Sequence, residues 1–136
     1  MKTDTVYLHH IKESIAAIEE FTQSMKKTEF LEKRIVQSAT IREIEIIGKA
    51  VKQISSKVQK KYPDIPWSQI ARTRDKMIHH YFGIDLHVIW NIITIDIPFL
   101  KKEIAAIEKQ NHQMLKEPAT KYNNSSLHIL TNCRVV

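Results

Sequence analysis

Apolar side chains recur at steps of three and four residues along most of this chain, which is the spacing of amphipathic helices. A first run follows Asp4, a suitable N-cap, and comprises Leu8, Ile11, Ile15, Ile18, Phe21 and Met25. A second run comprises Ile44, Ile47, Val51, Ile54 and Val58. The pattern therefore predicts two long helices, the second from about residue 30 to residue 60 with a possible bend near residues 38–40.

Two prolines end the second run, in the sequence "KYPDIP". Both lack a backbone donor and restrict the residue before them, so the helix should not continue through them. Pro66 is suited to be the first residue of a short third helix. We expect this helix to bury Trp67, Ile70 and Met77, and to be interrupted at Gly83.

A fourth helix is predicted after Asp85, which can cap it. Its apolar positions are Leu86, Ile89, Ile93, Ile97, Leu100, Ile104 and Ile107. The stretch "ITIDI" alternates like a strand, but the longer pattern favours a helix, which Pro98 should kink or leave with an unpartnered carbonyl near Thr94. With only two glycines available for tight turns, we expect an all-α fold, an antiparallel four-helix bundle.

The chain is long enough for one compact domain, with 136 residues of which 43% are hydrophobic. Beyond about residue 110 the helical period fades, and a proline and an Asn-Asn-Ser-Ser cluster appear. We therefore expect a helical bundle over residues 1–110 and a flexible tail over residues 111–136.

Cysteine usage and hydropathy favour a cytoplasmic protein. The single cysteine, Cys133, has no intrachain partner, so the chain offers neither a disulfide framework nor a cysteine-based zinc site. No apolar run approaches the roughly 18 to 20 residues that cross a bilayer, and the first residues lack the apolar stretch of a signal peptide. We expect no association with a membrane.

Positive charge is concentrated in the middle of the sequence. Residues 49–76 hold eight basic and two acidic side chains, an excess of six that equals the net charge of the whole chain, +6. A local positive field favours a polyanion such as RNA or DNA, or an acidic protein surface. A solvated helix face is the simpler alternative.

The sequence "ARTRDKMIHHYF", residues 71–82, ends this basic segment. At about 100° per residue, an ideal helix aligns Arg72 with His79, and Arg74 with Tyr81. By the same geometry Arg74 and His79 differ by about 140°. These two side chains can therefore share a site only if the helix ends between them, or if the site combines two protomers.

Arginine beside histidine is the minimum set of side chains for cutting RNA without a metal. The guanidinium binds and neutralises the phosphate, imidazole transfers a proton near neutral pH, and the 2′-hydroxyl of the substrate is the nucleophile. The same residues near a helix C-terminus can instead complement the helix dipole. A metal site would use His79, His80, Asp85 and His87, but adjacent histidines point apart and no His-Glu-x-x-His pattern is present.

Residues 63–104, "PDIPWSQIARTRDKMIHHYFGIDLHVIWNIITIDIPFLKKEI", resemble the HepT-like toxins of the HEPN superfamily. The segment "IREIEIIGKAVKQIS" is similar to the second-helix signature of that family, and the resemblance covers about residues 4–108. Its most specific element is an arginine, four intervening residues and then His-x-Tyr, here Arg74, His79 and Tyr81.

This resemblance implies an all-helical homodimer that acts as a metal-independent endoribonuclease toxin and needs no cofactor. It also implies a partner, a minimal nucleotidyltransferase antitoxin that silences the toxin by transferring AMP from ATP to the motif tyrosine. By this carry-over Arg74 binds the scissile phosphate, His79 is the acid/base group and Tyr81 is the modified residue. An adenylyl group on Tyr81 would block the cleft and repel RNA.

The sequence departs from the family pattern at Lys49, where the family often has glutamate after the glycine of the second helix. The wider HEPN pattern allows four to six residues between arginine and histidine. It therefore also admits the pairs Arg72 with His79, and Arg74 with His80.

Two neighbours of the motif have supporting roles in this interpretation. Asp75 would orient or screen the cations, and Lys76 would add to the positive field. Two other functions stay open at this point. The chain could be a non-catalytic subunit that binds a substrate or target for a nucleotidyltransferase, or it could be a simple helical dimerisation module.

Overall fold

The computed structural model describes residues 2–79 and 83–119, and it describes residues 2, 3, 79 and 111–119 by their backbone alone. The helices are α1 (Lys2–Thr22), α2 (Lys27–Glu32), α3 (Arg34–Gln53), α4 (Ser56–Lys61), α5 (Trp67–His79), α6 (Leu86–Asn91), the π-helix η2 (Ile92–Asp96) and α7 (Ile97–Ala119). This part of the chain contains no strand. The prediction of an all-α bundle is therefore confirmed.

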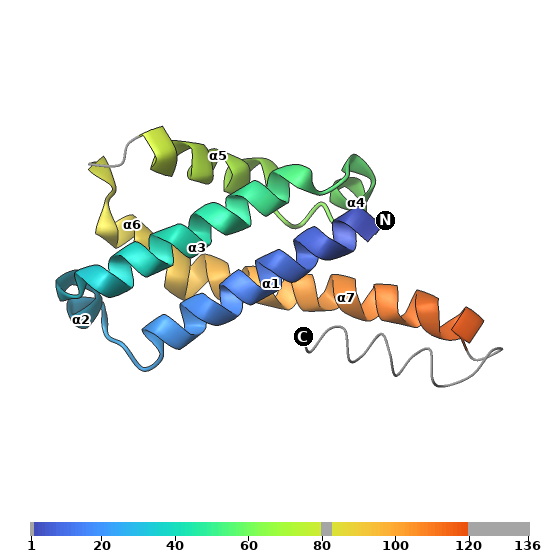
Figure 1. The fold of residues 1–136 in the computed structure, drawn as a ribbon, viewed down its shortest axis with the longest axis horizontal. Helices are drawn as coiled ribbons and strands as arrows, with labels where there is room; N and C mark the ends of the chain where they lie inside the picture. The colour runs from blue at the N-terminus through green and yellow to red at the C-terminus, as the bar shows by residue number, and fades with distance from the viewer. Residues whose placement is uncertain (1, 80–82, 120–136) are drawn as a thin grey trace. The chain divides into compact units, whose positions relative to one another are not determined.

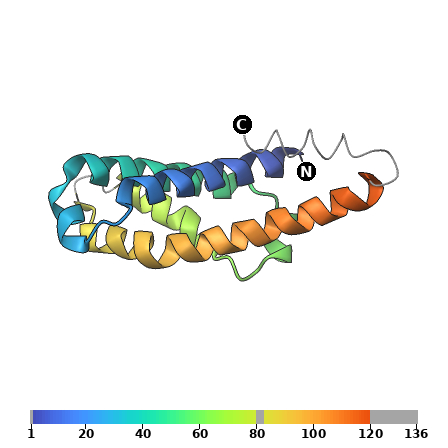
Figure 2. The ribbon, with the colours of Figure 1, turned by 90° about the horizontal axis from the view of Figure 1, so that it is seen from below.

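The described residues form two compact units, which divide between Lys101 and Lys102. In the first unit α3 is the central helix, because it packs against both α1 and α5. Both ribbon views show α1 and α3 running antiparallel to each other (Figures 1 and 2). In the second unit α7 continues to Ala119, with Ile104 and Ile107 buried.

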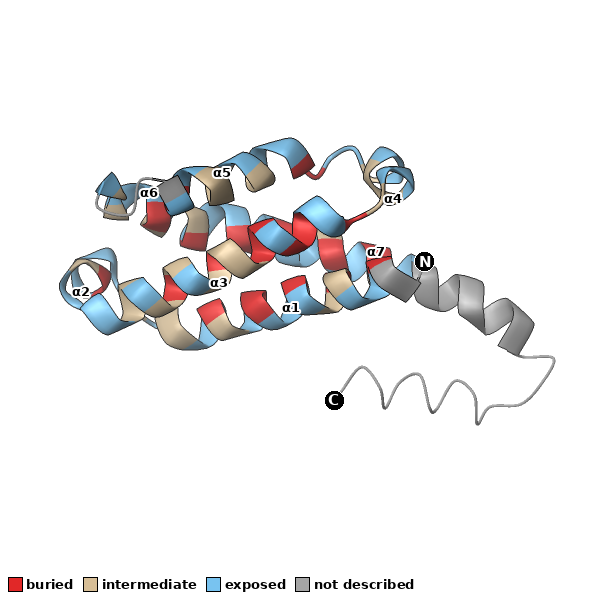
Figure 3. Ribbon diagram, turned by 45° about the horizontal axis from the view of Figure 1, so that its top comes forward, coloured by how far each residue is buried: buried red, intermediate tan, exposed pale blue. Residues whose placement is uncertain are grey.

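The periodic apolar positions of the sequence form the core. On α1 these are Leu8, Ile11, Ile15 and Ile18, and on α3 they are Ile44, Ile47, Ala50 and Val51. They form buried stripes on the ribbon (Figure 3). Each large aliphatic side chain contributes about 1.5–3 kcal/mol on burial, so the paired stripes are what hold α3 against α1.

A second, smaller contact fixes the short helix α2. Phe30, which is fully buried, packs its ring on that of Trp90, with the two ring centroids 5.4 Å apart. Because Trp90 lies on α6, this pair connects the start of the bundle to the segment that follows the motif helix.

The second predicted helix is three helices in the structure. Lys33 has an extended conformation and separates α2 from α3, and α3 continues through residues 38–40 to end at Gln53. Ser55 then caps α4 by accepting a hydrogen bond from the Val58 N–H, at 3.3 Å. The prediction of one helix from residue 30 to residue 60, bent near residues 38–40, was wrong.

Asp4 explains where α3 ends. It lies in the first turn of α1 and does not cap that helix, because α1 begins at Lys2. Its buried carboxylate accepts hydrogen bonds from the backbone N–H and the hydroxyl of Ser55, both at 2.8 Å. The start of α1 therefore holds the residue at which the chain turns from α3 into α4.

The prolines act largely as predicted. Helix α5 begins at Trp67, one residue after Pro66, whose carbonyl accepts the first helical hydrogen bond from the Ile70 N–H at 3.0 Å. Before Pro98 the helix widens into the π-helix η2, in which the Ile97 N–H donates to the Ile92 carbonyl. The expected irregularity at Pro98 thus takes the form of a π-turn.

The cap of the fourth predicted helix is confirmed, since the Asp85 carboxylate accepts a hydrogen bond from the His87 N–H at 2.9 Å. Helix α7 continues past Gln110 to Ala119, and residues 120–136 of the predicted tail lie outside the described residues. The boundary near residue 110 stays a prediction.

Among the described helices, none combines the length and apolar character that a membrane crossing requires.

Candidate functional site

Helix α5 carries the described part of the arginine–histidine motif. Trp67 and Met77 are buried as predicted, whereas Ile70, which was also predicted to be buried, is only partly buried. The Trp67 indole N–H donates to the Tyr62 carbonyl at 3.0 Å. Arg72 and Lys76 are exposed, whereas Arg74 is only partly exposed. The two arginines therefore occupy different environments although they are two residues apart.

Gly48 of α3 is the reason that Arg74 can lie where it does. This glycine is buried, and a Cβ atom at its position would overlap the Arg74 Cβ and lie 2.9 Å from the Arg74 Cγ. Only a hydrogen fits in this space. The aliphatic stem of Arg74 therefore packs directly on the backbone of α3, which fixes its direction.

Charges around Arg74 form a small network with α3. Lys52 Nζ lies 2.6 Å from Asp75 Oδ1, and Arg74 Nη1 lies 3.4 Å from the same oxygen. The hydrogen bond from Lys52 is the main cause that lowers the pKa of Asp75, and the positive charges of Lys52 and Arg74 add to it. Asp75 thus stays ionised and holds two cations from two helices.

The guanidinium of Arg74 has a donor that no neighbour in the described chain uses. Its Nε atom is buried and has no hydrogen-bond partner among the described residues, and the bond from its Nη1 to Asp75 is long. About a quarter of the side chain is exposed, 24%. The stem is thus held in place, and the exposed part of the side chain can meet an anion from solvent.

His79 is the last described residue of α5, and Gly83, the next described residue, is not part of that helix. The side chain of His79, and the whole of His80 and Tyr81, lie outside the described residues. Helix α5 is regular from Arg74 to His79. The Cα–Cβ directions of these two residues therefore differ by about 140° around the helix axis. The backbone of one protomer therefore does not place these two residues on one face of α5.

Other candidate residues do not share the ion-pair network of Arg74. Asp85 is engaged as the N-cap of α6, and His87 is exposed in the first turn of that helix. Lys76 and Lys49 are exposed and have no ion-pair partner among the described residues. Among the described side chains, no group of three histidine, cysteine or acidic residues could hold a metal ion.

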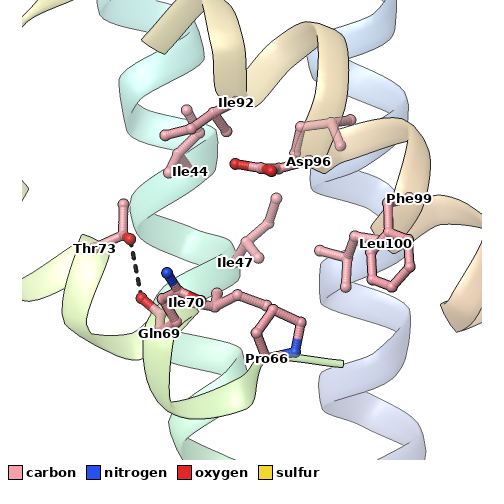
Figure 4. A pocket seen from close by; sticks show the side chains of 11 residues that line it. Ile44, Ile47, Pro66, Gln69, Ile70, Thr73, Ile92, Asp96, Phe99 and Leu100 are labelled. Atoms are coloured by element: carbon pink, nitrogen blue, oxygen red, sulfur yellow. Dashed lines mark hydrogen bonds between the residues drawn. The ribbon is translucent and has the colours of Figure 1, made fainter. Parts of the chain in front are cut away.

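An apolar cavity of about 170 Å³ lies between α3, α5 and the segment around η2. Figure 4 shows the Asp96 carboxylate among the isoleucine side chains that line it. Burial raises the pKa of Asp96. Apolar walls and an acidic group do not suit a phosphate, so this cavity is not part of the candidate RNA site.

The motif made Arg74 a candidate from the sequence, but two residues that position it were missed. Gly48 and Lys52 lie one helical turn apart on α3, so they share a face. That spacing was visible in the sequence. What could not be seen was that this face meets α5 at Arg74 and Asp75.

We predict that Gly48→Ala destabilises the protein by about 1–3 kcal/mol, because the new methyl group would overlap the stem of Arg74. Replacing glycine by alanine inside a helix normally stabilises a protein by about 1 kcal/mol. A destabilised Gly48→Ala protein would therefore indicate the steric overlap. Urea unfolding monitored by circular dichroism measures the change in stability. The matched control is Gly83→Ala, since no atom of the described residues lies within 4 Å of a Cβ there. A Gly48→Ala protein as stable as the parent would contradict the contact.

We also predict that Lys52→Met raises the pKa of Asp75 towards the ordinary carboxyl value of about 3.9. Because the folded pKa is lowered, the stabilisation by this carboxylate is present above that value and is lost as the pH falls through the lowered pKa. NMR titration of the Asp75 carboxyl carbon measures the shift. Lys49→Met, which removes an exposed lysine from the same helix, should leave the titration unchanged. An unmoved Asp75 titration in Lys52→Met would refute the pairing.

Comparison with known proteins identifies the family to which this chain is similar. The family model described as "Ribonuclease HepT-like" matches residues 11–107. A Methanocaldococcus jannaschii protein named "Gamma-glutamylcyclotransferase and putative RNase" is 42% identical over 87% of this chain and 52% of its own length. The chain therefore spans about half the length of that relative.

Shorter relatives match over nearly their full length. A protein of Thermococcus cleftensis named "Probable ribonuclease HepT" is 45% identical over 76% of this chain and 94% of its own length. A "Putative RNase" of Caldanaerobacter subterraneus is 36% identical over 79% of this chain and 96% of its own length. No solved structure gave a significant match. The helical bundle, the motif on α5 and these relatives together show that the chain belongs to the HepT-like ribonuclease family.

Proposed function

We propose that this protein is a metal-independent endoribonuclease toxin of the cytoplasm, active as a homodimer. The observation that carries the proposal is the placement of Arg74. Its stem is held on Gly48, its Nε has no partner in the described chain, and His79 follows on the same helix at the family spacing. Support also comes from family membership and from the ribonuclease names of the relatives.

The proposed reaction uses the RNA as its own nucleophile. The 2′-hydroxyl attacks the adjacent phosphorus and loses its proton to a base, and the bond to the 5′-oxygen breaks as that oxygen gains a proton. The products are a 2′,3′-cyclic phosphate and a 5′-hydroxyl. Arg74 would neutralise the phosphate oxygens, and imidazole of His79 would transfer protons near neutral pH.

A homodimer resolves the geometric conflict within α5. Because Arg74 and His79 diverge by about 140° along one helix, a site made by two protomers can combine arginine from one with histidine from the other. Asp75 and Lys52 would keep the Arg74 guanidinium at a fixed edge of this shared cleft.

The partner in this proposal is a minimal nucleotidyltransferase that transfers AMP from ATP to Tyr81. Tyr81 follows Arg74 by seven residues, so a helix continued to that point would place both on one stripe. An adenylyl phosphate would then bring negative charge to the position where Arg74 receives the RNA phosphate. Modification would both occupy the cleft and compete for its cation.

We predict that Arg74→Ala and His79→Ala each lower RNA cleavage by about 10²-fold or more and abolish growth arrest on expression. Cleavage of labelled RNA in EDTA measures the activity, and circular dichroism checks the fold. Matched controls are Arg42→Ala, an exposed arginine of α3, and His87→Ala, an exposed histidine of α6.

Two results would contradict this proposal. Equal cleavage by the parent and both motif variants would remove Arg74 and His79 from the chemistry. RNA left intact by the parent protein, together with a stable complex with a nucleotidyltransferase, would instead favour a non-catalytic binding subunit.

For the modification, we predict that intact-mass analysis after incubation with the partner and ATP shows AMP additions that are absent in Tyr81→Phe. The hydroxyl oxygen is the acceptor, and phenylalanine lacks it. Tyr7→Phe, which removes a hydroxyl from α1, is the matched control and should be labelled as the parent is. Full labelling of the Tyr81→Phe protein would show that another residue accepts the AMP group.

A further inference from the structure

A second basic site lies between α4 and the beginning of α5, away from the Gly48–Arg74 contact. Here an open groove of about 550 Å³ is lined by Lys60 of α4 and by Ser68 and Arg72 of α5, among other residues. Within the described part of the chain, no acidic side chain lines this groove. Its charge is therefore net positive, unlike that of the apolar cavity that holds Asp96.

Lys60 and Arg72 differ from Lys52 and Arg74 in whether an acidic side chain pairs with them. Lys52 and Arg74 share Asp75, whereas neither Lys60 nor Arg72 has an ion-pair partner among the described residues. Both side chains are exposed. Two uncompensated cations at one groove attract an anion more strongly than the same charges would if each were already paired.

The groove is preformed, because hydrogen bonds to backbone fix its floor and one wall. Trp67 is buried and its indole N–H is held by the Tyr62 carbonyl at 3.0 Å. Gln59 donates to the Ile54 carbonyl at 3.1 Å, which ties α4 to the end of α3. Lys60 and Arg72 are therefore attached to a backbone that is already ordered before a ligand binds.

The direction of α5 connects this groove to the proposed cleavage site. Arg72 and His79 are seven residues apart on a regular helix. They are therefore separated by about 20° around the helix axis and by about 10.5 Å along it. That separation is within reach of a strand a few nucleotides long. A backbone that crosses His79 can thus continue along α5 to Arg72 and Lys60.

We propose that the α4–α5 groove is a subsite for the phosphate backbone of single-stranded RNA flanking the cleaved bond. Lys60 and Arg72 neutralise its phosphates, and Ser68 offers a neutral hydrogen-bond donor. Because backbone contacts carry no base information, this subsite raises affinity for RNA of any sequence. The inference rests on the proposed ribonuclease function, and it gives Arg72 a binding role distinct from that of Arg74.

The test measures RNA binding with the full chain in a His79→Ala background, so that the substrate stays intact. Fluorescence anisotropy with a labelled single-stranded RNA gives the Kd at several KCl concentrations. The variant is Lys60→Gln combined with Arg72→Gln. The matched control is Lys27→Gln combined with Arg34→Gln, which removes one exposed lysine and one exposed arginine at α2 and the start of α3.

For a single strand, the slope of log K against log salt falls by roughly 0.7 for each phosphate that the protein no longer neutralises. We therefore expect the groove variant to bind RNA more weakly, with a slope smaller by about 1.4, and the control to match the parent. Equal slopes in the groove variant and the control would overturn the subsite. So would unchanged RNA binding together with weakened binding of the nucleotidyltransferase, because the groove would then serve a protein.

Failure of the proposed function gives a different result. If the parent protein with His79 intact does not cleave RNA, the ribonuclease proposal fails whatever the slopes are. If it cleaves RNA and the slopes are equal, the subsite alone is wrong.

Discussion

The close approach of α3 and α5 at Gly48 and Arg74 is the constraint on which the site depends. A helix glycine buried under an arginine stem brings the two backbones nearer than any side chain would allow. Helix α3 is itself held by the buried stripe of α1, so the direction of Arg74 is set by the core and not by a surface loop. A guanidinium so fixed meets a phosphate without first losing much conformational entropy.

That contact also divides the basic charge of the middle segment into two kinds. Asp75 compensates Lys52 and Arg74, which keeps the guanidinium in place and limits repulsion between the helices. No acidic side chain of the described residues compensates Lys60 and Arg72 at the α4–α5 groove. In this account the paired cations serve the reacting phosphate, and the free cations serve the rest of the strand. Under the proposed function, the positive segment is thus more than a solvated helix face.

Helical period and turn chemistry predicted most of the fold, because each depends on residues near one another in sequence. The cap at Asp85 and the irregularity at Pro98 are of this kind. The end of α3 is not, since it depends on a hydrogen bond between Asp4 and Ser55, which are 51 residues apart. The same holds for the site. The family motif identified Arg74 as a candidate, whereas the contact that positions it requires knowing which face of α3 meets α5.

The most direct test of the central claim compares one labelled oligonucleotide as RNA and as the fully 2′-deoxy strand, incubated with the protein in EDTA. In the proposed reaction Arg74 and His79 act on a nucleophile that the substrate supplies. The account therefore predicts cleavage of the RNA with 2′,3′-cyclic phosphate ends and an intact deoxy strand. Cleavage of both strands, or loss of RNA cleavage in EDTA, would contradict it.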